Sequence, residues 1–338
     1  MQLQLHPFQL QLRDAFRIAH GSRTEQPSMV VSLSQNGHTG YGEATATTYY
    51  GRTMENLTEK LESVRALIET TELKQPEDFW DLLYPHLEDD PFVLCALDEA
   101  AHDLRGRLQG KPVYRLWGLN PEKIPLTNYT IGIASIDEMV AKMNRLPWPI
   151  YKIKLGTDHD LEIIENLRQH TDAIFRVDAN TAWTPEQTVE LSPKLKALNV
   201  EFIEQPLLAE DWEGMRYVYQ HSALPVVADE SCQREPDVAR CHQHFHAINI
   251  KLMKCGGLTP ARRMIAEARK LGMEVMVGCM TESSVGISAI AQLLPLLDYV
   301  DMDGALLLSN DPANGVKIEA GKVFLTEDAG TGVSLKNG

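Results

Sequence analysis

The sequence predicts an α/β protein: a (β/α)8-type barrel, or modified TIM barrel, with an α+β capping domain formed by the N-terminus and the C-terminal tail. Eight short apolar runs alternate with helical segments, and they lie near residues 125–132, 151–156, 174–180, 201–206, 225–231, 247–252, 274–280 and 299–305. Runs that are apolar throughout are typical of parallel strands buried on both faces, and eight such strands can close into a barrel. Several runs end in charged residues, and the carboxyl ends of barrel strands are where active groups lie.

The capping domain is expected over 1–120, the barrel over 121–305, and a segment that returns to the capping domain over 306–338. The chain opens with alternating residues that predict strands near 3–12, 29–33 and 39–43. Asn36-Gly37, between the last two strands, is a strong hairpin signal.

Helical periodicity continues the capping domain and then separates the barrel strands. It covers 54–70, 76–87, 91–109, 137–146, 184–198 and 259–271. Gly110 and Pro112 end the third of these helices, because glycine favours a helix C-terminus and proline cannot continue one. Residues 121–125 are expected to be the linker into the barrel.

Two polar, glycine-containing stretches, 19–27 and 44–52, are predicted to be loops beside the N-terminal sheet. Such loops are commonly plain surface connections, but two of them flanking a small sheet can also close over a neighbouring site. The sequence leaves both interpretations open.

Composition points to a small-molecule ligand and to a cytoplasmic protein. The formal net charge is −15 and no block of Lys and Arg interrupts it, which argues against binding to nucleic acid or to an anionic membrane surface. No apolar run approaches the ~20 residues that span a bilayer, and the N-terminus does not resemble a signal peptide. The five cysteines form no C-x-x-C pair, so we expect reduced thiols.

Three acidic residues, Asp178, Glu204 and Asp229, end three successive predicted strands at matched spacing. Parallel strands would bring them to the same end of the barrel. Three hard oxygen ligands that converge on one point suit Mg²⁺. The alternative is that each acid caps the helix that follows its strand; the matched register of all three favours the metal site.

Lysines accompany these acids on the flanking strands. Lys152 and Lys154 lie two residues apart, so both side chains point to one face of their strand, and Lys251 ends the sixth strand. Lys154 and Lys251 would therefore face each other across the metal. A buried lysine beside a dication and a second ammonium is expected to have a lowered pKa, which suits a base; the alternative is a solvated charge at a strand end.

The segments K-I-K, V-D-A-N, E-Q-P, A-D-E-S and N-I-K-L-M-K-C-G-G, in this order, resemble the muconate-lactonising subgroup of the enolase superfamily. The resemblance spans nearly the whole chain and includes the helix A-L-D-E-A-A-H-D-L-R-G-R-L-Q-G. The eighth strand reads Y-V-D-M-D-G, and its D-x-D, Asp301 and Asp303, resembles the dipeptide epimerases of that subgroup, typified by L-Ala-D/L-Glu epimerase.

The resemblance implies a Mg²⁺-dependent epimerisation at the α-carbon of the C-terminal residue of a dipeptide. Asp178, Glu204 and Asp229 would bind one Mg²⁺ per subunit, and Lys154 and Lys251 would be the acid/base pair of a 1,1-proton transfer through an enediolate.

The resemblance also implies the substrate contacts. Lys152 would support the substrate carboxylate, and Asp301 and Asp303 would hold the free ammonium. The pocket would be completed by Thr130, Cys279, Met280 and Thr281. Glu282 is expected to orient a lysine. Arg23 would meet an acidic side chain on the second residue if its loop folds over the barrel, or else face solvent.

Other activities remain alternatives. An o-succinylbenzoate synthase or an N-acylamino-acid racemase would use the same lysines and metal, but neither substrate offers an ammonium to Asp301 and Asp303. A hydrophobic-dipeptide epimerase becomes the better candidate if Arg23 faces solvent. A barrel that only binds a small acid is disfavoured by the complete set of lysines and acids. The resemblance further suggests a homo-oligomer.

Overall fold

The computed structural model describes residues 1–18 and 21–336, and its largest part is a parallel sheet of eight strands. The strands are β4 (Tyr129–Ile131), β5 (Ile150–Lys154), β6 (Ile174–Asp178), β7 (Val200–Glu204), β8 (Val226–Ala228), β9 (Ala247–Lys251), β10 (Glu274–Gly278) and β11 (Tyr299–Asp301). They pair in sequence order from β4 to β11, and a parallel bridge between Thr127 and Val300 joins the two ends. The predicted barrel is confirmed.

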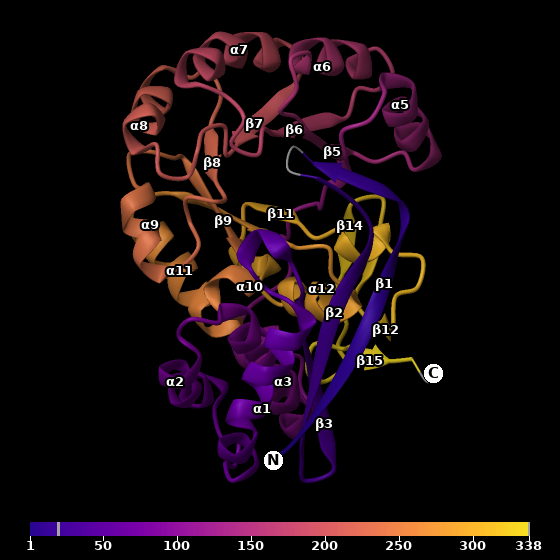
Figure 1. Ribbon diagram of the computed structural model, residues 1–338, viewed down its shortest axis with the longest axis vertical. Coiled ribbons are helices and arrows are strands. Elements are labelled where there is room, and N and C mark those ends of the chain that lie inside the picture. Colours follow the sequence, from indigo (N-terminus) through magenta and orange to yellow (C-terminus); the bar gives the residue numbers. More distant parts are fainter. Residues whose placement is uncertain (19–20, 337–338) are drawn as a thin grey trace.

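Helices alternate with these strands and surround them (Figure 1). They are α5 (Ile136–Arg145), α6 (Asp160–Arg168), α7 (Pro185–Ala197), α8 (Trp212–His221), α9 (Glu235–Cys241), α10 (Leu252–Cys255), α11 (Leu258–Lys270) and α12 (Ser284–Ala291), with 3-10 turns η2 (Leu294–Leu296) and η3 (Gly304–Leu307). The three predicted barrel helices agree with α5, α7 and α11 to within about a residue at each end, as helix assignments allow. Ser135 and Thr184 start α5 and α7 through capping boxes, because their hydroxyls accept otherwise unpaired amides.

The N-terminal sheet is antiparallel and consists of β1 (Gln2–Ile18), β2 (Gly21–Gln35) and β3 (His38–Thr45). Asn36 and Gly37 have φ of 51° and 77°, as a two-residue hairpin turn requires. Strand β2 begins well before the predicted residue 29, so residues 21–27 are strand, not loop. Pairing of β2 with β1 continues from Leu10–Gln26 past a register shift to Ile18–Gly21, and these backbone bonds override the weak strand propensity of polar residues. Residues 19–20 of the predicted loop lie outside the described residues.

The second predicted loop, 44–52, is short and ordered by backbone bonds. Strand β3 extends to Thr45, a 3-10 turn η1 (Thr48–Tyr50) follows, and Thr47 bridges to Arg52.

Four helices complete the N-terminal part: α1 (Met54–Glu69), α2 (Pro76–Leu87), α3 (Pro91–Gln109) and α4 (Val113–Leu116). Helix α3 packs directly on β3, since a Cβ atom at Gly42 would lie 2.0 Å from the carbonyl oxygen of Ala96. Its acidic residues fasten it to its surroundings. Asp98 accepts the Thr259 amide at the start of α11, and Asp103 accepts the amides of Tyr41 and Thr331.

The C-terminal segment forms short antiparallel pairs, β12 (Ala313–Asn314) with β15 (Ser334–Leu335) and β13 (Lys317–Glu319) with β14 (Lys322–Phe324). It contacts the N-terminal part through a bridge from Leu308 to Leu12 and a bond from the Ser309 amide to the Gln11 carbonyl. Among the helices of the described residues, none has the length and apolar character needed to cross a membrane.

Candidate active site

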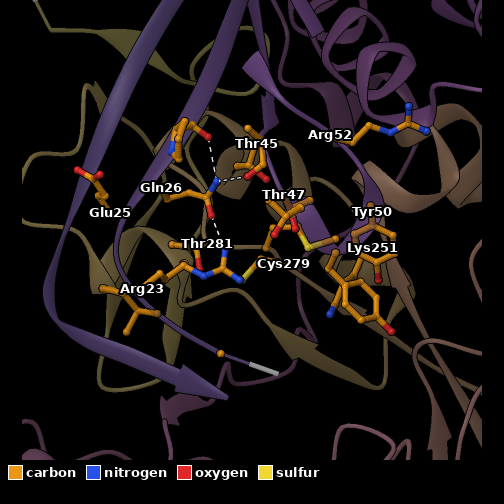
Figure 2. Close-up of a pocket in the computed structure, with 18 of the residues that line it drawn as sticks. Arg23, Glu25, Gln26, Thr45, Thr47, Tyr50, Arg52, Lys251, Cys279 and Thr281 are labelled. Atoms are coloured by element: carbon orange, nitrogen blue, oxygen red, sulfur yellow. Dashed lines mark hydrogen bonds between the residues drawn. The ribbon is translucent and has the colours of Figure 1, made fainter. Parts of the chain in front are cut away.

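A cavity of about 800 Å³ lies between the carboxyl ends of the barrel strands and the N-terminal part. Figure 2 shows side chains from β2, from the turn after β3 and from the barrel around it. Residues 21–23 and 25–27 and residues 45–50 and 52 belong to its wall. The two stretches predicted as loops therefore border the site. This favours the interpretation that they close over a neighbouring site, and not that they are plain surface connections.

Asp178, Glu204 and Asp229 meet at the barrel end. Asp178 and Glu204 close β6 and β7, where they are paired in register, and Asp229 follows β8 directly. One carboxylate oxygen from each lies within 4.8 Å of the other two, and all three side chains are buried. This is the predicted convergence of three acids.

The alternative role, capping of the next helices, is not what the structure shows. Helix α7 is capped by Thr184 and helix α8 by Asp211. A buried oxygen of Glu204, Oε2, lies 2.7 Å from Lys152 Nζ without a hydrogen bond of good geometry. Three buried carboxylates that offer hard oxygen ligands fit a Mg²⁺ ion, and one of these oxygens receives no well-aligned hydrogen bond from the protein.

The lysines flank these acids from both sides. Lys154 Nζ on β5 lies 2.6 Å from Asp178 Oδ2, and Lys251 Nζ at the end of β9 lies 2.8 Å from Asp229 Oδ2. Strands β6, β7 and β8 separate β5 from β9 in the sheet. The two ammonium groups thus approach the acids from opposite directions, as the sequence predicts.

Lys152 is fully buried and lies at the centre of the charges. Its Nζ is 2.9 Å from Asp301 Oδ2, 2.7 Å from Glu204 Oε2 and 3.1 Å from Asp178 Oδ2. Burial lowers the pKa of Lys152, but the surrounding carboxylates raise it more, so that the net value is well above the usual one. Burial also lowers the pKa of Lys251, and the charge of Asp229 raises it. The net pKa of Lys251 is again well above its usual value.

The protein's own groups alone therefore raise the pKa of Lys152 and Lys251, and the lowered pKa expected for a lysine beside a dication stays a prediction. The protein's own carboxylates hold Lys152 and Lys251 protonated. A lysine that acts as a base in this site depends on additional positive charge, such as that of a dication.

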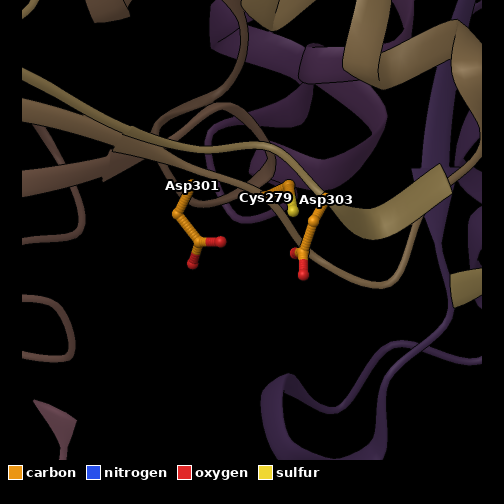
Figure 3. A group of neighbouring side chains, drawn as sticks. All are labelled: Cys279, Asp301 and Asp303. Atoms are coloured by element: carbon orange, nitrogen blue, oxygen red, sulfur yellow. The ribbon is translucent and has the colours of Figure 1, made fainter. Parts of the chain in front are cut away.

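Asp301 ends β11, the last strand of the barrel, and Asp303 follows two residues later. Their carboxylates point the same way, with Cys279 between them (Figure 3). Asp301 is bound by Lys152 and by Asn128, whose Nδ2 donates to Oδ1 at 2.7 Å. Asp303 Oδ2 accepts the backbone amide of Thr130. Burial, together with the charge of Asp301, raises the pKa of Asp303 to about 7.

The remaining predicted pocket residues also border the cavity. These are Thr130, Cys279, Met280 and Thr281 from the barrel and Arg23 from β2. Arg23 is half-buried and donates from Nη1 to Gln26 Oε1. It therefore faces the cavity, in contrast to the solvent-facing alternative.

Within the described part of the chain, Glu282 forms no hydrogen bond or ion pair with a lysine, although the charge of Lys251 acts on its pKa; its role in orienting a lysine stays a prediction. Its Oε1 accepts the Met280 amide at 2.8 Å. Burial raises the pKa of Glu282 well above its usual value, and the negative charges of Glu43 and Glu99 add to this shift. Its Oε2 lies against Gly286 in the first turn of α12.

Sequence reasoning missed three side chains of the site. Lys254 in α10 donates to Asp229 Oδ1 at 2.6 Å, and Asn249 Nδ2 donates to Glu204 Oε1 at 2.8 Å. Glu230 lines the cavity, and burial followed by the charge of Asp229 raises its pKa to about 8. Asn249 lies two residues before Lys251 on one strand, so the period of two was a signal that could have found it.

Comparison with known proteins gives matches to both parts of the chain. The model "Enolase C-terminal domain-like" matches residues 134–338, and the model "Mandelate racemase / muconate lactonizing enzyme, N-terminal domain" matches residues 3–118. The chain is 56% identical over 335 residues to an L-Ala-D/L-amino acid epimerase of Flavobacterium johnsoniae, covering 99% of this chain and 100% of that protein. It is 43% identical to an L-Ala-D/L-Glu epimerase of Bacteroides thetaiotaomicron, covering 98% and 88%.

Solved structures agree with these matches. The substrate complex of the L-Ala-D/L-Glu epimerase from Bacillus subtilis superposes with a TM-score of 0.93 at 26% identity, covering 98% of both chains. A dipeptide epimerase from Enterococcus faecalis, complexed with Mg and the dipeptide L-Leu-L-Tyr, gives a TM-score of 0.91 at 30% identity, covering 98% and 99%.

Proposed function

Because this chain is an isomerase that belongs to the enolase superfamily, with the N-terminal domain of the mandelate racemase and muconate lactonizing enzyme type, we propose that it epimerises dipeptides at the α-carbon of the C-terminal residue. The observation that carries the proposal is the pair of ammonium groups, Lys154 and Lys251, on opposite sides of three converging acids. A reaction that inverts one carbon needs a proton acceptor on one face and a proton donor on the other.

In this proposal Asp178, Glu204 and Asp229 hold one Mg²⁺ per subunit. When bound, the ion would supply positive charge that stabilises the negative charge developing on the substrate carboxylate as the α-proton leaves. The same charge opposes the effect of the acids on the lysines, and so favours a neutral amine on one of them.

The lysines then divide the proton transfer. The neutral one, Lys154 for one enantiomer and Lys251 for the other, accepts the α-proton at Nζ. The opposite lysine, in its ammonium form, donates a proton to the other face of the same carbon. Lys152, whose pKa is raised by its acidic neighbours, stays charged and supports the substrate carboxylate.

Recognition of the dipeptide is assigned to two groups of residues that line the cavity. Asp301 and Asp303 would hold the free N-terminal ammonium, for which an N-acyl substrate has no counterpart. Arg23 would pair with an acidic side chain on the second residue, which favours substrates of the L-Ala-D/L-Glu type. Epimerases of hydrophobic dipeptides also occur among the relatives, at 34% identity, and a neutral surrounding for the second side chain would favour that activity.

A dipeptide library incubated in D₂O and analysed by mass spectrometry tests the proposal. The expected result is one deuterium at the α-carbon of the second residue, with Ala-Glu among the best substrates. Exchange into N-acylamino acids but into no dipeptide would assign the chain to the racemases instead. Absence of exchange into both classes would leave only a binding function.

A further inference from the structure

We infer that Gln26 is a positioning residue that fixes the Arg23 guanidinium in the cavity and thereby sets the selectivity for an acidic side chain. The inference rests on the proposed function and deepens it. Gln26 lies on β2 with 2% of its surface exposed, and it lines the same cavity as Arg23.

The carboxamide of Gln26 can take only one orientation. Its nitrogen, Nε2, donates to two backbone carbonyl oxygens, that of Pro27 at 2.9 Å and that of Ala46 at 2.5 Å. A carboxamide has two N–H donors, so both are used. Rotation by half a turn would place Oε1 against two carbonyl oxygens, which have no hydrogen to donate, and is therefore excluded.

The orientation of the amide leaves Oε1 facing Arg23, and Nη1 of Arg23 donates to it at 2.5 Å (Figure 2). This bond uses one of the five N–H groups of the guanidinium. It fixes the long side chain by one end and leaves the other donors for a ligand. An arginine held in advance loses less conformational entropy when it binds a carboxylate.

Because residue 26 carries an amide and not a carboxylate, it does not change the net charge beside Arg23. Gln26 accepts a hydrogen bond without neutralising Arg23. Within residues 1–18 and 21–336, no Asp or Glu lies at ion-pair distance from Arg23, and the nearby Glu25 accepts instead from Gln11. The guanidinium of Arg23 is thus oriented by a neutral partner, and its positive charge remains available to an anionic side chain of a ligand.

Gln26 also connects the two stretches that wall the cavity. Ala46 follows β3, and its amide donates to the Pro27 carbonyl, so the two stretches share a pair of backbone and side-chain bonds. Loss of the Gln26 side chain would release Arg23 and loosen one of these contacts, without touching the barrel.

The test compares L-Ala-L-Glu with L-Ala-L-Gln, which have the same shape and differ in charge. The quantity measured is the ratio of their kcat/KM values in wild type, Gln26→Met, Arg23→Met and the double variant. Methionine matches the length of the Gln26 side chain, replaces Arg23 with a shorter unbranched apolar chain, and forms no such hydrogen bonds. We expect the ratio to fall about tenfold or more in each single variant, mainly through a higher KM for Ala-Glu, since a charge-assisted bond is lost.

The double variant supplies the decisive measurement. If Gln26 acts only through Arg23, removal of Gln26 in the Arg23→Met background leaves the ratio unchanged. Gln26→Glu, a second variant in case Gln26→Met is unstable, places a carboxylate beside Arg23 and is also expected to lower the ratio.

Gln35→Met is the matched control. Gln35 is the last residue of the same strand, and its side chain also bonds to backbone groups, the carbonyl oxygen and the amide of Leu73. It lies outside the cavity, so its variant is expected to lose stability and keep the ratio.

Two results would overturn the inference: a wild-type ratio in Gln26→Met while Arg23→Met loses it, or an equal loss for both dipeptides in Gln26→Met. Failure of the proposed function is a separate result, in which the wild type epimerises neither dipeptide. The ratio of the two Kd values from calorimetry then replaces the kinetic ratio, and equal Kd values in the wild type would also reject the role of Gln26.

Discussion

The two sides of the cavity are built in different ways. On the barrel side, Asp178, Glu204 and Lys154 sit at the ends of parallel strands whose register places them together, and their contacts are ion pairs at buried positions. On the opposite side, Arg23 is held by one hydrogen bond that it donates to the neutral amide of Gln26, on a two-stranded extension of an antiparallel sheet.

The difference separates chemistry from selectivity. A register shared by several strands fixes the acids and lysines collectively, so a change in any of them disturbs the others. The residues of β2 and of the turn after β3 can change individually while the barrel keeps its charges. We therefore expect large effects on turnover from the barrel side and smaller effects, specific to one substrate or one condition, from the other side.

The largest effect is expected for Asp178→Asn. The change removes one negative ligand from the proposed metal site, and activity should fall at least about a thousandfold, because several kcal/mol of charge stabilisation are lost. Elemental analysis should find less Mg²⁺ in the variant. Asp211→Asn is the control, since Asp211 caps α8 outside the site. Full wild-type activity in excess chelator, with no metal found, would reject the metal site.

The next effect concerns the two lysines. Lys154→Ala and Lys251→Ala should each abolish epimerisation, since both faces of the carbon are needed. Each variant should still exchange the α-proton of one enantiomer with D₂O, and the two variants should differ in which enantiomer that is. Exchange is followed by NMR from both diastereomers of one dipeptide. Lys194→Ala, on an exposed lysine paired with Glu190, is the control. Retained epimerisation in either site variant would exclude a two-base mechanism.

A smaller effect, on binding, is expected for Asp303→Asn. The variant loses a negative partner for the substrate ammonium, and the Kd for Ala-Glu should rise about tenfold or more. N-acetyl-Glu should be affected little. Since the pKa of Asp303 is raised to about 7, wild-type Kd should also rise as the pH falls through that value, and calorimetry should show a weaker dependence in the variant. Equal losses for Ala-Glu and N-acetyl-Glu would contradict an ammonium subsite.

The same contrast explains what the sequence could predict. The eight strands, the helices α2 and α3, and the convergence of Asp178, Glu204 and Asp229 followed from local patterns, because strand period and β/α spacing determine which residues reach the barrel end. The extension of β2 over residues 21–27 did not, since its polar residues become strand only through pairing with β1. The orientation of Glu282 and the net pKa of the lysines depend on neighbours far apart in sequence, and no local pattern carries them.

The contact between helix α3 and strand β3 differs from both sides of the cavity, and it gives the smallest predicted effect. Glu99 of α3 is fully buried, accepts the Glu43 amide at 3.0 Å and the thiol of Cys95, and has no cation among these partners. Burial raises the pKa of Glu99 from 4.5 to about 8, although the bond from the Glu43 amide opposes the shift. The carboxyl group is thus neutral near pH 7 in the folded state and ionised in the unfolded state.

The consequence for stability follows from proton binding. Between pH 4.5 and about 8 the folded state holds a proton on Glu99 that the unfolded state has lost. The free energy of unfolding therefore decreases as the pH rises through this range, with the contribution fully present below 4.5 and lost above about 8. In Glu99→Gln this contribution is absent, while the amide oxygen can still accept from Glu43. Urea unfolding at several pH values from about 6 to 9 should show a shallower decline for the variant.

A decline of some size should remain in Glu99→Gln, because burial also raises the pKa of Glu43 and of Glu282. Glu190→Gln, at an exposed position on α7, should keep the wild-type slope. A Glu99→Gln slope equal to that of wild type would mean that Glu99 is ionised in the folded protein. The contact between α3 and β3 would then contain an unpaired buried charge. In that case this contact would not differ from the barrel end by having neutral acids in place of paired charges.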